Sequence, residues 1–127
     1  DGESNEGQIW EAAATAAHYN LDNLTVFVDM NGLQNDGYTR EIMSMESMPD
    51  KWKAFGWNVL SVDGHNIVQV INAIDTAKSF AGKPTVILCK TVKGKGVSFM
   101  ESVVDFHGKA PDEEQYIKAK KELQSAM

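Results

Sequence analysis

Apolar residues along the chain fall into two patterns, helix-like spacing and short unbroken runs. From about residue 7 to 19 they recur every three or four positions among strong helix formers, which predicts a helix with Ser4 and Asn5 as its capping residues. Unbroken apolar or β-branched runs predict strands over residues 24–28, 57–62 and 85–92. Further helices are predicted over residues 49–55, 66–80 and 112–124, the last with Tyr116, Ala119 and Leu123 facing inward.

Strands that are separated by helices indicate an α/β fold with a parallel sheet and helices on both faces, a three-layer α/β/α arrangement. The run at 24–28 consists entirely of apolar or β-branched residues, so we expect that strand to be covered on both faces. Residues 31–39 are rich in Gly, Asn and Asp and are expected to form a loop at its carboxyl end, where ligands bind in such sheets. Because no strand leads into the first helix, the sequence also predicts an N-terminally truncated piece of a larger domain.

Composition narrows the function classes. A chain of 127 residues is one small domain, and a net charge of −6 argues against a nucleic-acid or anionic membrane surface. The single cysteine, Cys89, excludes a disulfide-stabilised secreted scaffold, so a cytoplasmic location is expected. An apolar run of the roughly 18 residues that a membrane span needs is absent from the sequence.

Two polar positions suggest a cation and phosphate site. Asp1 and Gly2 come just before a predicted helix, where backbone N–H groups and the helix dipole favour a phosphate. Asn31 comes directly after the first predicted strand, so both side chains are expected at the carboxyl edge of the sheet. A carboxylate, a carboxamide and a main-chain carbonyl are hard oxygen ligands for Mg²⁺ or Ca²⁺, and phosphate oxygens would complete the octahedron of Mg²⁺.

The spacing from Asp1-Gly2 to Asn31 resembles the thiamine diphosphate fingerprint of transketolase. The segments at 1–12 and 31–37 are similar to the N-terminal subunit of the split, two-polypeptide transketolases of bacteria and archaea. Three further segments also match, at 62–65, 90–101 and 106–111, so the resemblance covers nearly the whole chain. It implies the thiamine diphosphate-binding fold, with residues 1–127 as the C-terminal part of a domain that binds this cofactor and Mg²⁺, for which Ca²⁺ or Mn²⁺ can substitute.

The resemblance also implies roles for individual residues. The metal ligands would be Asp1, Asn31 and, through its carbonyl, Leu33, and the cofactor-binding residues would be Gly2, Glu3, Asn31, Leu33, Lys93 and His107. His107 and Glu6 would serve in catalysis, His107 at the diphosphate and sugar and Glu6 at an intersubunit contact that couples two active sites. Asn35 departs from the family, which often has an apolar residue there under the cofactor rings. His18, His65 and Cys89 are interpreted as structural.

The implied activity is transfer of a two-carbon ketol unit between sugar phosphates, in the pentose phosphate pathway. It requires a pyrimidine-binding C-terminal transketolase subunit or domain, in a dimer of such units, so the isolated chain is expected to be inactive. Two alternatives stay open: another thiamine diphosphate enzyme, either deoxyxylulose-phosphate synthase or the α-subunit of a 2-oxo acid dehydrogenase, or a non-catalytic remnant of a cofactor domain. Xylulose 5-phosphate against pyruvate as substrate separates the enzymes, and hydrogen exchange tests for the protected core that a preformed binding module needs.

Overall fold

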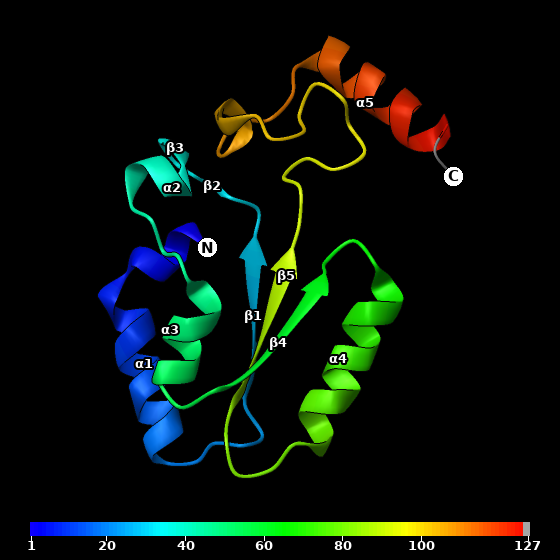
Figure 1. Ribbon diagram of the computed structural model, residues 1–127. Helices are drawn as coiled ribbons and strands as arrows, with labels where there is room; N and C mark the ends of the chain where they lie inside the picture. The colour runs from blue at the N-terminus through cyan, green and yellow to red at the C-terminus, as the bar shows by residue number, and fades with distance from the viewer. Residues whose placement is uncertain (126–127) are drawn as a thin grey trace.

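The strands and helices of the chain follow the predicted order. The computed structural model describes residues 1–125 (Figure 1). Its main elements are α1 (Gly7–His18), β1 (Thr25–Met30), α3 (Met48–Ala54), β4 (Asn58–Asp63), α4 (Ile67–Ser79), β5 (Thr85–Lys90) and α5 (Glu113–Ser125). Each predicted helix and strand is therefore present, with ends that differ from the prediction by no more than two residues.

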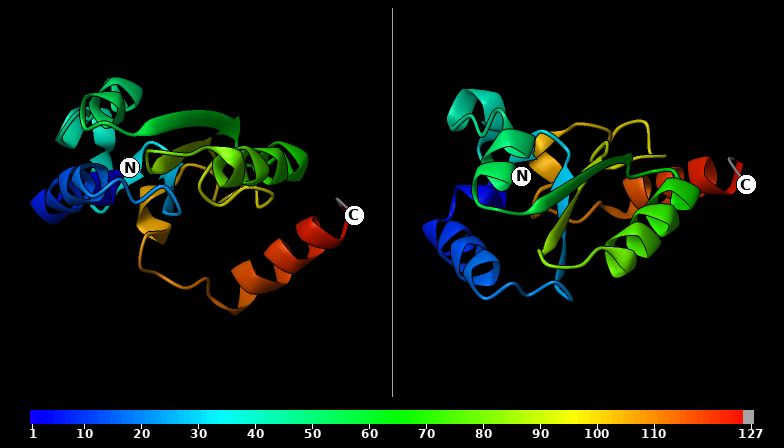
Figure 2. Two further views of the ribbon diagram at one scale, coloured as in Figure 1. Left: turned by 90° about the horizontal axis from the view of Figure 1, so that it is seen from below. Right: turned by 60° about the horizontal axis from the view of Figure 1, so that its bottom comes forward.

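The sheet is parallel, as predicted, with β5 between β1 and β4. Every residue of β5 except Lys90 is buried, which explains its unbroken apolar sequence. Helices α1 and α3 lie on one side of the sheet and α4 on the other (Figures 1 and 2). On the α1 side, the small residues Ala13 and Ala16 let the helix approach closely, and Trp57 donates a 2.9 Å hydrogen bond from Nε1 to the Ala13 carbonyl.

The prediction that the first strand is covered on both faces is wrong. β1 is an edge strand, and the side chain of Phe27 on it is 49% exposed. On the α4 side of the sheet, a hydrophobic cluster that contains Ala73, Ile87 and Cys89 packs α4 against β5 and β4. Phe27 has no place in that cluster, so the apolar run indicated a strand correctly but not the extent of its cover.

The segment after β1 contains more structure than the predicted loop. It forms a short hairpin, β2 (Leu33–Gln34) with β3 (Gly37–Tyr38), followed by the single turn α2 (Thr39–Ile42). At the start of the chain, the 3-10 turn η1 (Gly2–Asn5) precedes α1. The predicted capping role of Ser4 and Asn5 is wrong, because Glu6 is the residue before α1 and its side chain makes no capping hydrogen bond. Such short elements are held by tertiary contacts, which periodicity does not reveal.

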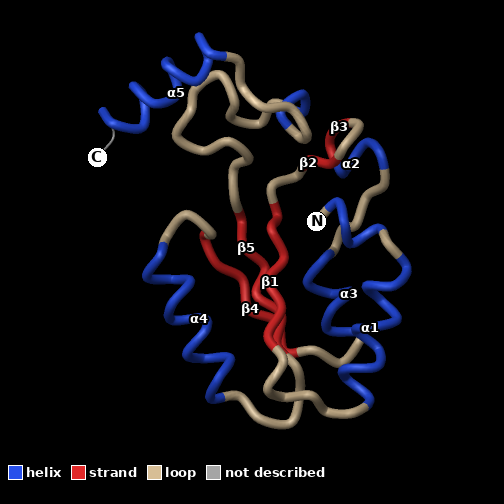
Figure 3. The backbone as a smooth tube through the Cα atoms, turned by 180° about the vertical axis from the view of Figure 1, so that it is seen from behind, coloured by secondary structure: helices blue, strands red, loops and turns tan. Residues whose placement is uncertain are grey.

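The chain after β5 crosses above the carboxyl ends of the strands and carries η2 (Val104–Phe106) and α5 (Figure 3). The inward positions predicted for α5 are wrong for Tyr116 and Leu123, which are 52% and 47% exposed, while Ala119 is half-buried. A polar contact holds the helix instead: the N–H and Oγ of Ser98 donate to the Glu122 carboxylate at 2.6 and 2.8 Å. These bonds hold the pKa of Glu122 below its ordinary value.

Among residues 1–125, the helices are too short or too polar to cross a membrane.

Candidate cofactor and metal site

The turn η1 brings Asp1 against the carboxyl end of β1. Asp1 Oδ2 accepts a 2.7 Å hydrogen bond from the Gly32 N–H, and its Oδ1 accepts one of 3.0 Å from the Gly2 N–H. The predicted proximity of Asp1 to the residues that follow the first strand is therefore confirmed.

The second half of the site is the turn from Asn31 to Gln34. Asn31 Oδ1 accepts a 2.9 Å hydrogen bond from the Leu33 N–H, and Asn31 Nδ2 donates to Asp29 Oδ2 at 3.1 Å. A carboxamide oxygen has two lone pairs, so Oδ1 keeps one for a further donor or a cation. The turn thus presents the Asn31 side-chain oxygen and the Leu33 carbonyl close to the Asp1 carboxylate.

These two halves are packed tightly against each other at Gly2. A Cβ atom added to Gly2 would lie 2.7 Å from Gln34 Cβ and 3.5 Å from the Leu33 carbonyl oxygen. Beside this contact, Asn5 Nδ2 donates a 3.0 Å hydrogen bond to Gln34 Oε1. Glycine at position 2 is therefore required by the protein's own packing, a reason that the sequence does not reveal.

A cavity of about 480 Å³ opens beside these two turns, and we call it the His107 cavity. Most of the predicted site residues line it: Asp1, Gly2, Glu3, Glu6, Asn31, Leu33 and His107. Its other lining residues are Asn5, Asp29, Gln34, Asn35 and Asp36. Lys93 is the one predicted cofactor-binding residue outside this lining, at the start of the loop that follows β5. The structure thus gathers the metal and catalytic candidates and leaves Lys93 apart from them.

His107 reaches the cavity from the far end of the chain. It follows η2, and its N–H donates a 2.8 Å hydrogen bond to the Val104 carbonyl. Phe106, the last residue of η2, packs edge-on against Phe99 with ring centroids 5.9 Å apart. This contact anchors the turn to the loop after β5, so the exposed imidazole is carried by a supported segment.

Sequence reasoning missed four polar residues of the lining. Asp29 had a usable signal, since an acidic residue near the end of an apolar strand indicates a functional position. Asp36 and Gln34 stood within the expected loop without a distinguishing pattern, and Asn5 was given a different role. Asn35, which departs from the family, does line the cavity and is exposed, so its amide faces water.

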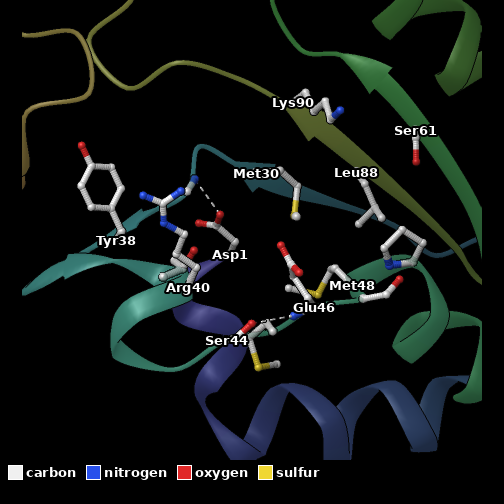
Figure 4. A pocket seen from close by; sticks show the side chains of 15 residues that line it. Asp1, Met30, Tyr38, Arg40, Ser44, Glu46, Met48, Ser61, Leu88 and Lys90 are labelled. Atoms are coloured by element: carbon white, nitrogen blue, oxygen red, sulfur yellow. Dashed lines mark hydrogen bonds between the residues drawn. The ribbon is translucent and has the colours of Figure 1, made fainter.

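A second cavity of about 490 Å³, the Met30 cavity, also borders Asp1 (Figure 4). Its wall is largely apolar, with Met30, Met48 and Leu88, and it carries the cations of Arg40 and Lys90. Asp1 lines both cavities and thus stands between an apolar space and a polar one. The lining of the His107 cavity contains many more carboxylate and amide side chains than the lining of the Met30 cavity, so we place the candidate cation site in the His107 cavity.

The donor atoms fit a hard cation better than a transition metal. Within residues 1–125, three or more His, Cys, Asp or Glu side chains do not come together in a way that would hold a metal ion. The available donors are one carboxylate, one carboxamide oxygen and one main-chain carbonyl, which suit Mg²⁺ when phosphate oxygens supply the remaining ligands. The residues present therefore fit a cation that is bound together with a diphosphate.

The residues interpreted as structural take such positions. His65 Nε2 accepts a 2.7 Å hydrogen bond from the Val92 N–H, which links the turn after β4 to the loop after β5. Cys89 is buried in β5, and desolvation raises the pKa of its thiol. His18 packs edge-on against Tyr19 at the exposed end of α1.

Comparison with known proteins identifies the family. Residues 1–125 match the family model described as transketolase, thiamine diphosphate binding domain. The 6-deoxy-6-sulfo-D-fructose transketolase subunit SqwG of Clostridium sp. (strain MSTE9) is 50% identical over 98% of this chain and 45% of its own length. One of the subunits of the apulose-4-phosphate transketolase of Phocaeicola vulgatus is 44% identical over 97% of this chain and 44% of its own length.

The fold agrees with that assignment. The crystal structure of transketolase from Campylobacter jejuni superposes with a TM-score of 0.90 at 31% identity, over 98% of this chain and 19% of that one. The Pichia stipitis transketolase solved with sedoheptulose-7-phosphate gives 0.89 at 28% identity, over 98% of this chain and 18% of that one. The chain spans less than half the length of the curated relatives it matches. On this evidence the chain belongs to the transketolase family and represents its thiamine diphosphate binding domain.

Proposed function

We propose that the chain forms the diphosphate- and Mg²⁺-binding half of a transketolase, which transfers a two-carbon ketol unit between sugar phosphates when paired with a pyrimidine-binding subunit. The observation that carries the proposal is the His107 cavity, where Asp1, Asn31, Leu33 and His107 meet from separate parts of the chain. The named relatives are transketolase subunits, which favours this reaction over the other thiamine diphosphate enzymes. Their designation as subunits supports a partner chain.

In this proposal the cation is held by Asp1, Asn31 and the Leu33 carbonyl. The Asp1 carboxylate supplies the negative charge, and the hydrogen bond that it accepts from Gly32 keeps it turned toward Asn31. Gly2 keeps η1 close to the Leu33 carbonyl, because a side chain there would collide with Gln34. Thiamine diphosphate, when bound, would supply the electron sink that ketol transfer needs, while the residues of this chain would supply position and charge.

His107 and Glu6 act at the edges of this cavity. The exposed imidazole of His107 is free to donate a hydrogen bond to a diphosphate or sugar oxygen, and η2 holds it above the site. Glu6, exposed at the start of α1, is placed to meet the partner chain and to couple its site to this one. Lys93 would join the site through the loop after β5.

The substrate proposal follows from the relatives' names. One is named for 6-deoxy-6-sulfo-D-fructose and the other for apulose 4-phosphate, both sugars with an anionic group at one end. We propose a ketose with a terminal anion as donor and an aldose phosphate as acceptor. Magnesium, a cytoplasmic location and a place in pentose phosphate metabolism belong to the same proposal.

The experiment that tests this function is reconstitution with a candidate pyrimidine-binding subunit. The mixture is given Mg²⁺, thiamine diphosphate and an aldose phosphate, with xylulose 5-phosphate, 6-deoxy-6-sulfofructose, apulose 4-phosphate or pyruvate as donor. We expect ketol transfer from at least one of the three ketoses, none from pyruvate, and loss of activity in Asp1→Ala. Turnover by the isolated chain, or with pyruvate alone, would contradict the proposal.

A further inference from the structure

All three proposed cation ligands lie on two short segments, which are joined by two hydrogen bonds. One bond runs from the Gly32 N–H to Asp1 Oδ2, so it uses the carboxylate that is proposed to hold the cation. The other runs from Asn5 Nδ2 to Gln34 Oε1 at 3.0 Å and uses no ligand atom. The Asn5 to Gln34 bond is therefore the connection that a bound cation leaves unchanged.

We propose that Asn5 and Gln34 form a positioning pair that orients the Leu33 carbonyl relative to the Asp1 carboxylate and thereby sets the affinity for the cation and the diphosphate. This inference rests on the proposed function, because it assigns roles toward the cofactor and metal of that site. Neither residue is a catalytic residue, since each acts through the ligands on its own segment.

The covalent geometry of the chain connects Gln34 to the ligand. The Leu33 carbonyl and the Gln34 N–H belong to one planar peptide unit, so fixing Gln34 fixes the direction of that carbonyl. On one side, the hairpin pairs Gln34 with Gly37 and Leu33 with Tyr38. On the other, Asn5 holds the Gln34 side chain, and Gln34 Cβ lies only 2.7 Å from the position that a Cβ on Gly2 of η1 would take. The peptide unit is thus held from both sides.

The side-chain oxygen of Asn5, a half-buried residue, indicates that the position of this amide is not set by stability alone. Its Oδ1 is buried and has no hydrogen-bond partner among the residues that the structure describes. A buried polar atom without a partner costs free energy, and such atoms in native proteins call for a specific explanation. The 3.0 Å bond of the same amide to Gln34, beside the candidate ligands, provides one.

The test is a double-mutant cycle on the transketolase assembled from this chain and its pyrimidine-binding partner. The variants are Asn5→Ala, Gln34→Met and the double variant, with Asn72→Ala, at an exposed position of α4 outside both cavities, as the matched control. Mn²⁺ affinity is measured by electron paramagnetic resonance and thiamine diphosphate affinity by calorimetry. Steady-state kinetics then gives the change in KM for the cofactor and the change in kcat separately. Near-ultraviolet circular dichroism checks folding, and Asn5→Ser replaces Asn5→Ala if the latter folds poorly.

We expect each single variant to weaken Mn²⁺ binding about 10-fold, as is typical when a partner of a metal ligand is removed. The double variant should lose no more than either single one, because all three lack the same bond. KM for the cofactor should rise by more than kcat falls, and Asn72→Ala should stay within about 2-fold of wild type. Gln34→Glu should bind at least as tightly as wild type because it keeps an acceptor for Asn5.

Two results would overturn the inference while leaving the proposed function intact: single variants that bind Mn²⁺ like wild type, or losses that add in the double variant. Wild-type protein that binds neither Mn²⁺ nor thiamine diphosphate would overturn the proposed function itself, and the inference with it.

Discussion

Replacement of Gly2 by alanine tests how closely the two halves of the site must approach. The added Cβ would lie 2.7 Å from Gln34 Cβ and 3.4 Å from Gln34 Cα, atoms at the base of the side chain that no rotation can remove. Ordinary contact begins near 3.4 Å, so η1 or β2 must move by at least about 0.7 Å. Overpacking of this kind costs about 1–3 kcal/mol of stability. The same movement displaces the Leu33 carbonyl, so we expect thiamine diphosphate affinity in the presence of Mg²⁺ to fall about 10-fold.

Gly7→Ala is the matched control, because a Cβ at Gly7 meets nothing within 4 Å. Gly7 is the first residue of α1, where alanine is a better helix former by up to about 1 kcal/mol. Denaturant unfolding gives the stability of both variants, and calorimetric titration gives their cofactor affinity. A Gly2→Ala protein that unfolds and binds like the wild type would refute the steric argument, as would a Gly7→Ala protein with the same losses.

Three further predictions concern the supports of the site. Trp57→Phe removes the buried hydrogen bond to the Ala13 carbonyl and part of the contact with Trp52. The free energy of unfolding, measured with denaturant, should therefore fall by about 2 kcal/mol, and an unchanged value would contradict this packing. The folded state lowers the pKa of Glu122, so the contact of α5 with Ser98 adds stability above the ordinary carboxyl pKa and loses it as the pH falls through the lowered value. We expect the protection factor of the Ser98 amide, which corrects for the intrinsic pH dependence of exchange, to fall on acidification in the wild type but not in Glu122→Gln. An equal pH response in both proteins would argue against this contact. His65→Ala removes the acceptor for the Val92 N–H and should speed hydrogen exchange of that amide. His65→Gln keeps an acceptor within reach and should exchange more slowly than His65→Ala. Equal exchange rates in the two variants would show that His65 does not hold the loop.

The larger elements of the fold could be predicted because each has a local signal. The runs at Val86, Ile87 and Leu88 indicated a buried strand, and these residues form the centre of the sheet. Phe27 shows where this reasoning fails, since an apolar strand residue does not reveal whether a helix covers it. The β2 to β3 hairpin and η1 were missed for a related reason, because segments of two to four residues depend on distant contacts.

The candidate site was predicted in part. The predicted strand order placed Asp1 and Asn31 at one edge of the sheet, the family resemblance added His107, and all three line one cavity. The hydrogen bond between Asn5 and Gln34 could not be predicted, because it joins two polar residues from segments that look unremarkable by themselves. The position of Lys93 outside the cavity lining depends on the path of the loop after β5, which has no periodic pattern. Motifs therefore indicate which residues meet, and only the structure shows what holds them in place.

The central claim is that Asp1, Asn31 and the Leu33 carbonyl together hold a divalent cation beside a diphosphate. The most direct test is a crystal structure of the assembled enzyme with Mn²⁺ and thiamine diphosphate, in which anomalous scattering locates the metal. We predict one peak in the His107 cavity, about 2.0–2.1 Å from an oxygen of each of these three residues, the spacing of an Mg²⁺-type site. A peak elsewhere, or a bound cofactor whose metal contacts neither Asp1 nor Asn31, would contradict it.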